Sequence, residues 1–187
     1  VRTGGMVARF DNTQPTVIED CWNSGDVIFN GKVGYRSGGT LKVGGFTGTS
    51  AACPHAVKGY LINSGNVSIS GEQDGGSTVY VAGVSGEFGK NLTLVEGETE
   101  ALIANTGTIT FNGSTKYSMT ASGIAGILKG TVQEGIKFVN TGNVSATGVV
   151  ATADADRISG VAGVVAIPSQ PIPYAECYCT VNAMGYQ

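Results

Sequence analysis

Asn23-Ser24-Gly25-Asp26-Val27 is the first of four near-copies of one short motif in this chain. Successive copies begin 35 to 42 residues apart, so the motif recurs through most of the 187 residues. A period of this length indicates an array built from one repeated supersecondary unit. The later copies are Asn63-Ser64-Gly65-Asn66-Val67, Asn105-Thr106-Gly107-Thr108-Ile109 and Asn140-Thr141-Gly142-Asn143-Val144.

A second motif, Gly-apolar-x-Gly, falls between the copies of the first. When the units are aligned, each motif gives a column of apolar residues. If the units stack as coils, each column becomes a ladder inside the molecule, in which a fully buried member contributes roughly 1.5–3 kcal/mol. The first column is Val27, Val67, Ile109 and Val144, and the second is Phe46, Val84, Ile124 and Val161.

Corner residues accompany these columns in every unit. An Asn side chain can bond its own turn backbone, and Gly tolerates a close backbone approach that a Cβ would obstruct. The corners contain Asn23, Asn63, Asn105 and Asn140 with Gly25, Gly65, Gly107 and Gly142.

Three segments of each unit carry strand signals: one before the Asn corner, one after it, and one that leads into Gly-apolar-x-Gly. Alternating apolar and polar residues, as in 67–70, indicate half-buried strands. No window combines a 3.6-residue apolar period with a helix cap and stop. The sequence therefore predicts an all-β parallel β-helix, or β-solenoid, of about four coils of 35–42 residues, with three short strands per coil and almost no helix.

The domain organisation follows from the same period. We expect a single β-solenoid array over 1–187, with repeats at about 16–55, 56–97, 98–134 and 135–171 and partial repeats at 1–15 and 172–187. Because both ends fall within a repeat and neither resembles a polar cap, we expect a fragment of a longer chain.

The composition of the chain limits the kinds of partner that it can bind. The net charge is −3 and the Lys and Arg residues are scattered singly, which argues against nucleic acid, since binding it needs a clustered basic face. No apolar run approaches the roughly 20 residues of a membrane span. Low charge and a surface rich in Thr, Ser, Asn and Gly suggest an extracellular or cell-surface protein.

Four cysteines, Cys21, Cys53, Cys177 and Cys179, allow two disulfides with three connectivities. The plainer interpretation, that Cys21 and Cys177 are small buried apolar residues, is favoured. His55 follows Cys53-Pro54, and we expect it to be a surface residue in a loop. No metal site or cofactor is expected, because a Cys-x-Cys with one distant His is not a zinc pattern.

Gly-apolar-x-Gly followed by Cys-aromatic-x-x-Gly-x-Val resembles the GLUG-type repeat of large bacterial surface and secreted proteins. Residues 21–27 match the second half most fully and 123–126 the first, although Leu61, Ile103 and Phe138 replace the Cys. The resemblance implies an extracellular stalk or adhesion segment, and it assigns no catalytic residues.

An enzyme is the main alternative, because parallel β-helices often carry polysaccharide lyases and hydrolases. Glycoside hydrolysis needs paired carboxylates, but the acids here fall in loops rather than in one outward column. A shallow sugar-binding site is a further alternative, in which aromatic rings cover the apolar side of a sugar. Its candidate residues are Tyr35, Arg36, Lys116 and Tyr117, although the plainer interpretation, in which the tyrosines cover loop backbone, is favoured.

The sequence thus favours a non-enzymatic structural and adhesive segment of a bacterial surface or secreted protein. Such a rigid stalk would present loops or neighbouring domains and could self-associate end to end. Its expected partners are other domains of the same protein, a host or matrix protein or glycan, and other copies. A carbohydrate-binding or carbohydrate-active β-helix is the alternative function.

Overall fold

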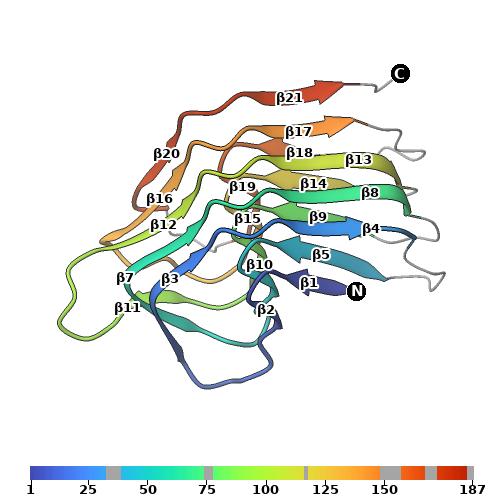
Figure 1. Ribbon diagram of the computed structural model, residues 1–187. Coiled ribbons are helices and arrows are strands. Elements are labelled where there is room, and N and C mark those ends of the chain that lie inside the picture. Colours follow the sequence, from blue (N-terminus) through green and yellow to red (C-terminus); the bar gives the residue numbers. More distant parts are fainter. Residues whose placement is uncertain (33–38, 74–77, 116–117, 148–156, 167–171, 185–187) are drawn as a thin grey trace.

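The computed structural model describes residues 1–32, 39–73, 78–115, 118–147, 157–166 and 172–184. In these residues every regular element is a β-strand, and all strand pairs are parallel. Figure 1 shows the strands stacked in rows from the blue N-terminal strands to the red C-terminal strands. The chain is therefore a β-solenoid, as the sequence predicts.

Four parallel sheets run along the stack, and the chain passes through each of them five times. Sheet A consists of β1 (Arg2–Gly4), β5 (Thr40–Gly44), β9 (Thr78–Ala82), β14 (Met119–Ser122) and β18 (Arg157–Ser159). Sheet B consists of β2 (Val7–Arg9), β6 (Thr47–Thr49), β10 (Ser85–Phe88), β15 (Ala125–Leu128) and β19 (Ala162–Val165).

Sheets C and D lie on either side of the Asn corners. Sheet C consists of β3 (Thr16–Asn23), β7 (His55–Asn63), β12 (Ala101–Asn105), β16 (Ile136–Asn140) and β20 (Ala175–Cys177), with the short β11 (Leu92–Leu94) beside β7. Sheet D consists of β4 (Val27–Asn30), β8 (Val67–Gln73), β13 (Ile109–Thr115), β17 (Val144–Thr147) and β21 (Val181–Met184).

One apolar core lies between sheets A and D. The column that begins at Val27 runs through it, and strand pairing places Val67, Ile109 and Val144 in successive register above Val27. All four side chains are buried, with at most 5% of their surface exposed. Like residues therefore stack on like residues along this core.

A second core lies between sheets B and C. Phe46, Val84 and Ile124 of the second column are buried in it, and Val161 packs against its edge. Phe88, Phe138 and other large side chains fill the remaining space. Each coil thus has two apolar cores, one on either side of the Asn corner.

Sheet B is formed by a fourth strand in each coil, in addition to the three that the sequence predicts. Each of these strands begins at the third residue of Gly-apolar-x-Gly, as in Thr47–Thr49 and Ser85–Phe88. These runs are only three or four residues long and differ in composition, from Thr-Gly-Thr in β6 to Ala-Gly-Ile-Leu in β15, so they lack the alternation by which the other strands are recognised. Parallel pairing with the coils above and below forms the strand instead.

Candidate functional site

The corner asparagines form a continuous ladder of side-chain amides through the interior. The Nδ2 of Asn23 donates to the Oδ1 of Asn63 at 2.7 Å, and Asn63 donates to Asn105 and Asn105 to Asn140 at 2.8 Å each. The last three of these side chains are fully buried. These bonds link each coil to the next one. They also satisfy the buried amides, each of which would carry a large desolvation cost if it had no partner.

The same amides also close their own corners. The Nδ2 of each Asn donates to the carbonyl oxygen of the Gly two residues later, at 2.7 Å from Asn63 to Gly65 and 2.7 Å from Asn105 to Gly107. Every amide in the middle of the ladder therefore makes three hydrogen bonds, which is nearly its full capacity.

The two sequence motifs meet at this ladder. A Cβ added to Gly83 would lie 2.3 Å from the Cγ of Asn105 and 2.0 Å from the carbonyl oxygen of Gly123. Gly45 stands in the same relation to Asn63, with 2.2 Å to its Oδ1. The first Gly of Gly-apolar-x-Gly is thus required because the next Asn corner along the chain fills the space where its side chain would be.

A buried charge cluster lies where sheets A and B meet. Glu87, with 1% of its surface exposed, binds the ammonium groups of Lys42 and of Lys129, the latter at 2.7 Å, and accepts a hydrogen bond from the Oγ1 of Thr49 at 3.0 Å. Burial alone would raise the pKa of Glu87, but the hydrogen bonds from Lys129 and Lys42 outweigh it and lower the pKa to about 2. The carboxylate therefore stays charged and binds together three successive coils.

His55 is placed differently from the sequence prediction of an exposed loop residue. It is the first residue of β7, only 1% exposed, and its ring meets Phe10 and Phe88 edge-on at centroid distances of 5.0 and 6.0 Å. Neither ring nitrogen has a hydrogen-bond partner among the described residues. Burial lowers the pKa of His55 to about 4, so the imidazole is neutral at pH 7.

The outer surface of sheet C carries ion pairs between neighbouring coils. Glu19 pairs with Lys58 at 2.6 Å, and Glu100 pairs with Lys137. A hollow of about 290 Å³ lies beside the second pair, lined by Gly59, Ala101 and Leu102 as well. These charges are largely exposed, and such pairs contribute little to stability.

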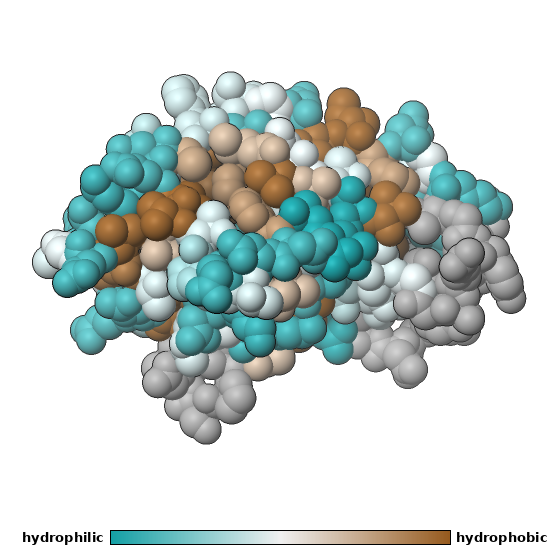
Figure 2. Space-filling view, turned by 90° about the horizontal axis from the view of Figure 1, so that it is seen from below, coloured by the Kyte–Doolittle hydropathy of each residue, from teal (hydrophilic) through white to brown (hydrophobic). Residues whose placement is uncertain are grey.

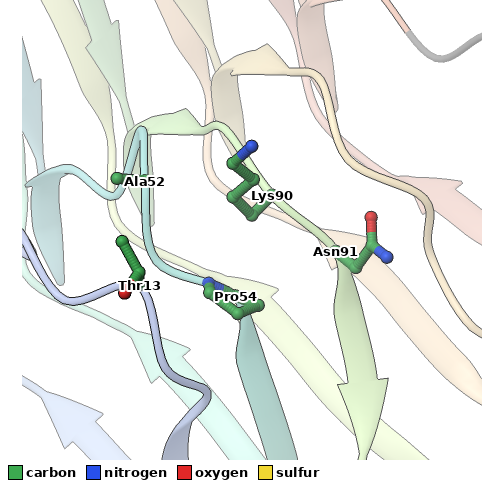
Figure 3. A pocket seen from close by; sticks show the side chains of 5 residues that line it. All are labelled: Thr13, Ala52, Pro54, Lys90 and Asn91. Carbon is green, nitrogen blue, oxygen red and sulfur yellow. The ribbon is translucent and has the colours of Figure 1, made fainter.

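A larger open hollow, of about 550 Å³, is drawn in Figure 3. Its five lining residues are Thr13, Ala52, Pro54, Lys90 and Asn91, and they come from the loops that precede sheet C. Among the described residues, the lining contains one ammonium group and no carboxylate. The acid pair that glycoside hydrolysis needs is therefore not provided by these residues.

The four predicted ligand-binding residues, Tyr35, Arg36, Lys116 and Tyr117, lie outside the described residues. Within the part of the chain that is described, no group of three or more His, Cys, Asp or Glu is placed to hold a metal ion. That same part contains no helix long and apolar enough to cross a membrane.

All four cysteines are free thiols. Cys53 is buried, but Cys21 is only partly buried and Cys177 is exposed, so the prediction that Cys21 and Cys177 are buried is wrong. Both lie in the outermost coils that the structure describes, in β3 and β20, each of which pairs with a neighbouring strand on one side only.

Fold and ladder define a β-solenoid whose coils are joined by stacked amides and aliphatic rungs. Comparison with protein-family models, curated proteins and solved structures gives no match.

Proposed function

We propose that this chain is a non-enzymatic structural and adhesive segment of a bacterial cell-surface or secreted protein. In this role it is a rigid stalk that presents loops or neighbouring domains at a distance from their anchor. The observation that carries the proposal is the uninterrupted ladder from Asn23 to Asn140, which joins four successive coils through the centre of the molecule.

Rigidity follows from how the coils are joined. Each coil contacts the next through four parallel sheets, two apolar cores and one amide ladder, so that bending the stack would open several interfaces at once. The cluster at Glu87 adds a buried ionic link across three coils. These contacts suit a spacer better than a site that must open and close.

Both end faces of the stack support stacking against further coils, either of the same protein or of a second copy. Met6 on the first coil and Val181 on the last are in register with the buried Phe46 and Val144 of the neighbouring coils, yet they are 50% and 42% exposed. Figure 2, seen from the side of the first coil, shows hydrophobic patches among the polar residues of this face. In the part of the chain that is described, each outermost strand pairs with one neighbour only, so its other edge is available to pair with a further strand.

Single-molecule force spectroscopy tests the stalk directly. With the chain held by its two ends, we expect it to resist extension and then to unfold in steps of one repeat, each releasing roughly 130 Å for about 40 residues. Smooth extension at low force would refute a rigid stalk. An Asn105→Ala variant, which removes one amide from the ladder, should lower the force of the steps that involve the middle coils.

A second assay addresses the enzymatic alternative. The chain is incubated with a panel of acidic and neutral polysaccharides, and new reducing ends and unsaturated products are measured. We expect no turnover above that of heat-unfolded protein. Sustained release of either product by the folded chain would overturn the non-enzymatic role while leaving the solenoid intact.

A further inference from the structure

The last corner of the solenoid is built from different residues than the others. In the ladder corners, the Asn amide donates to the carbonyl of the Gly two residues later, at 2.7 to 2.9 Å. Strand pairing of β20 with β16 places Cys177 in register with Asn140, and Val181 is in register with Val144. Cys177-Tyr178-Cys179 therefore takes the place of Asn140-Thr141-Gly142.

The two thiols close this corner as the Asn and Gly close the others. The Sγ atoms of Cys177 and Cys179 lie 2.9 Å apart. A disulfide bond is about 2.05 Å long, so the sulfur atoms need to approach by less than about 1 Å. The backbone bends at Cys179, which shortens the span between the two residues relative to an extended strand.

The surroundings leave room for the pair. A Cβ on Gly160 would lie 2.1 Å from the Sγ of Cys177, so Gly at this position provides the space that the sulfur occupies. Cys177 is exposed, whereas Cys179 is partly buried and interacts with the side chain of Asn140 at the end of the ladder. Burial, together with the hydrogen bond and charge of Cys177, raises the pKa of Cys179 to about 11. The exposed thiol is therefore the one that reagents reach first.

We propose that Cys177 and Cys179 form a reversible disulfide that locks the last corner of the solenoid, in place of the Asn-to-Gly hydrogen bond. The oxidant is a small disulfide such as oxidised glutathione. The thiolate of Cys177 attacks it and releases one glutathione thiol. The thiolate of Cys179 then attacks the mixed disulfide at the Cys177 sulfur and releases the second. Two thiols are oxidised, one glutathione disulfide is reduced, and the two protons pass to the two glutathione thiolates.

The other two cysteines serve as internal controls, because their sulfur atoms contact oxygen atoms. The sulfur of Cys53 is buried 3.1 Å from the Oγ1 of Thr16, and that of Cys21 lies 3.5 Å from the carbonyl oxygen of Glu19. Neither is expected to pair when the folded protein is oxidised. The inference concerns a modification site and does not depend on the proposed stalk function.

The experiment treats the reduced, folded full chain with oxidised glutathione and counts free thiols after denaturation. We expect the count to fall from four to two and to return to four with dithiothreitol. Peptide mapping should locate the loss of two hydrogens in one peptide that contains both Cys177 and Cys179. Hydrogen exchange should slow at the amide of Tyr178, which donates to the carbonyl of Asn140 at 2.8 Å.

Variants make the assignment specific. Cys21→Ser and Cys53→Ser should still lose two thiols, whereas Cys177→Ser and Cys179→Ser should keep a stable glutathione adduct or remain reduced. The proposal is overturned if the wild-type chain retains four thiols, if it carries glutathione without an internal disulfide, or if it forms disulfide-linked dimers. Thiol protection that requires added zinc would show a metal site instead and would also overturn it.

Discussion

Replacing Asn105 by Ala removes one rung from the middle of the amide ladder. Its side chain accepts a hydrogen bond from Asn63 and donates to Asn140, both at 2.8 Å, and donates to the carbonyl of Gly107 at 2.7 Å. Each such bond contributes about 1 kcal/mol net, and the site is fully buried, so water does not replace the lost partner. We therefore expect the free energy of unfolding to fall by about 3 kcal/mol.

The matched control is Asn66→Ala, in the same kind of corner but on the outside. The Oδ1 of Asn66 accepts one bond, from the backbone N–H of Thr108 at 3.0 Å, and its side chain is exposed. Water can replace this bond, so we expect a loss below about 1 kcal/mol. Both variants are compared with the wild type by guanidinium unfolding followed by circular dichroism, with m-values checked because repeat arrays can depart from two-state behaviour.

A double variant strengthens the test. Asn63→Ala and Asn105→Ala each remove the bond that joins these two residues, so the double variant should lose about 1 kcal/mol less than the two single losses combined. If Asn105→Ala costs no more than Asn66→Ala, or if the two ladder substitutions are simply additive, then the buried ladder does not exist in solution.

Three further predictions follow from the buried groups and from the corners. The pKa of His55 is lowered from 6.5 to about 4, so the folded state loses stability as the pH falls from 6.5 towards 4 and is unaffected by this group above pH 6.5. Across this range the free energy of unfolding should drop by about 3 kcal/mol more in the wild type than in His55→Phe. Glu87→Gln, which leaves a buried ammonium group without its counterion, should lower the free energy of unfolding by about 3 kcal/mol, whereas the exposed Glu100→Gln should cost less than about 1 kcal/mol; equal losses would contradict the buried cluster. Gly107→Ala, whose Cβ would lie 2.0 Å from a backbone oxygen, should lower the melting temperature, and Gly25→Ala, with its nearest contact at 3.8 Å, should not.

The repeat could be predicted from the sequence because equivalent residues recur at a nearly regular spacing along the chain. Stacking places each residue of one coil above the equivalent residue of the preceding coil, so Val27, Val67, Ile109 and Val144 appear as a column in an alignment. The Asn residues appear as a column for the same reason. What the alignment does not show is that the Gly motif lies against the Asn corner, since that contact depends on how each coil folds back on itself.

The features that could not be predicted from the sequence, the Glu87 cluster and the burial of His55, depend on contacts between residues of different columns. Glu87 is a single acid beside Thr49 and Ile127, and its lysine partners come from the coils before and after it. His55 follows Pro54 and resembles a loop residue, yet rings from two other segments enclose it. No local spacing encodes either arrangement. The short strands of sheet B were missed for a related reason, since pairing between coils forms them.

Nuclear Overhauser measurements between the methyl groups of the aliphatic column test the solenoid most directly. In a chain with labelled Val and Ile methyls, the stack places Val67 beside Ile109 and Ile109 beside Val144, one strand spacing of about 4.8 Å apart. We predict strong contacts for these two pairs and none between Val67 and Val144, which are about two spacings apart. Absence of the neighbouring contacts, or a direct contact between Val67 and Val144, would contradict the stacked coils.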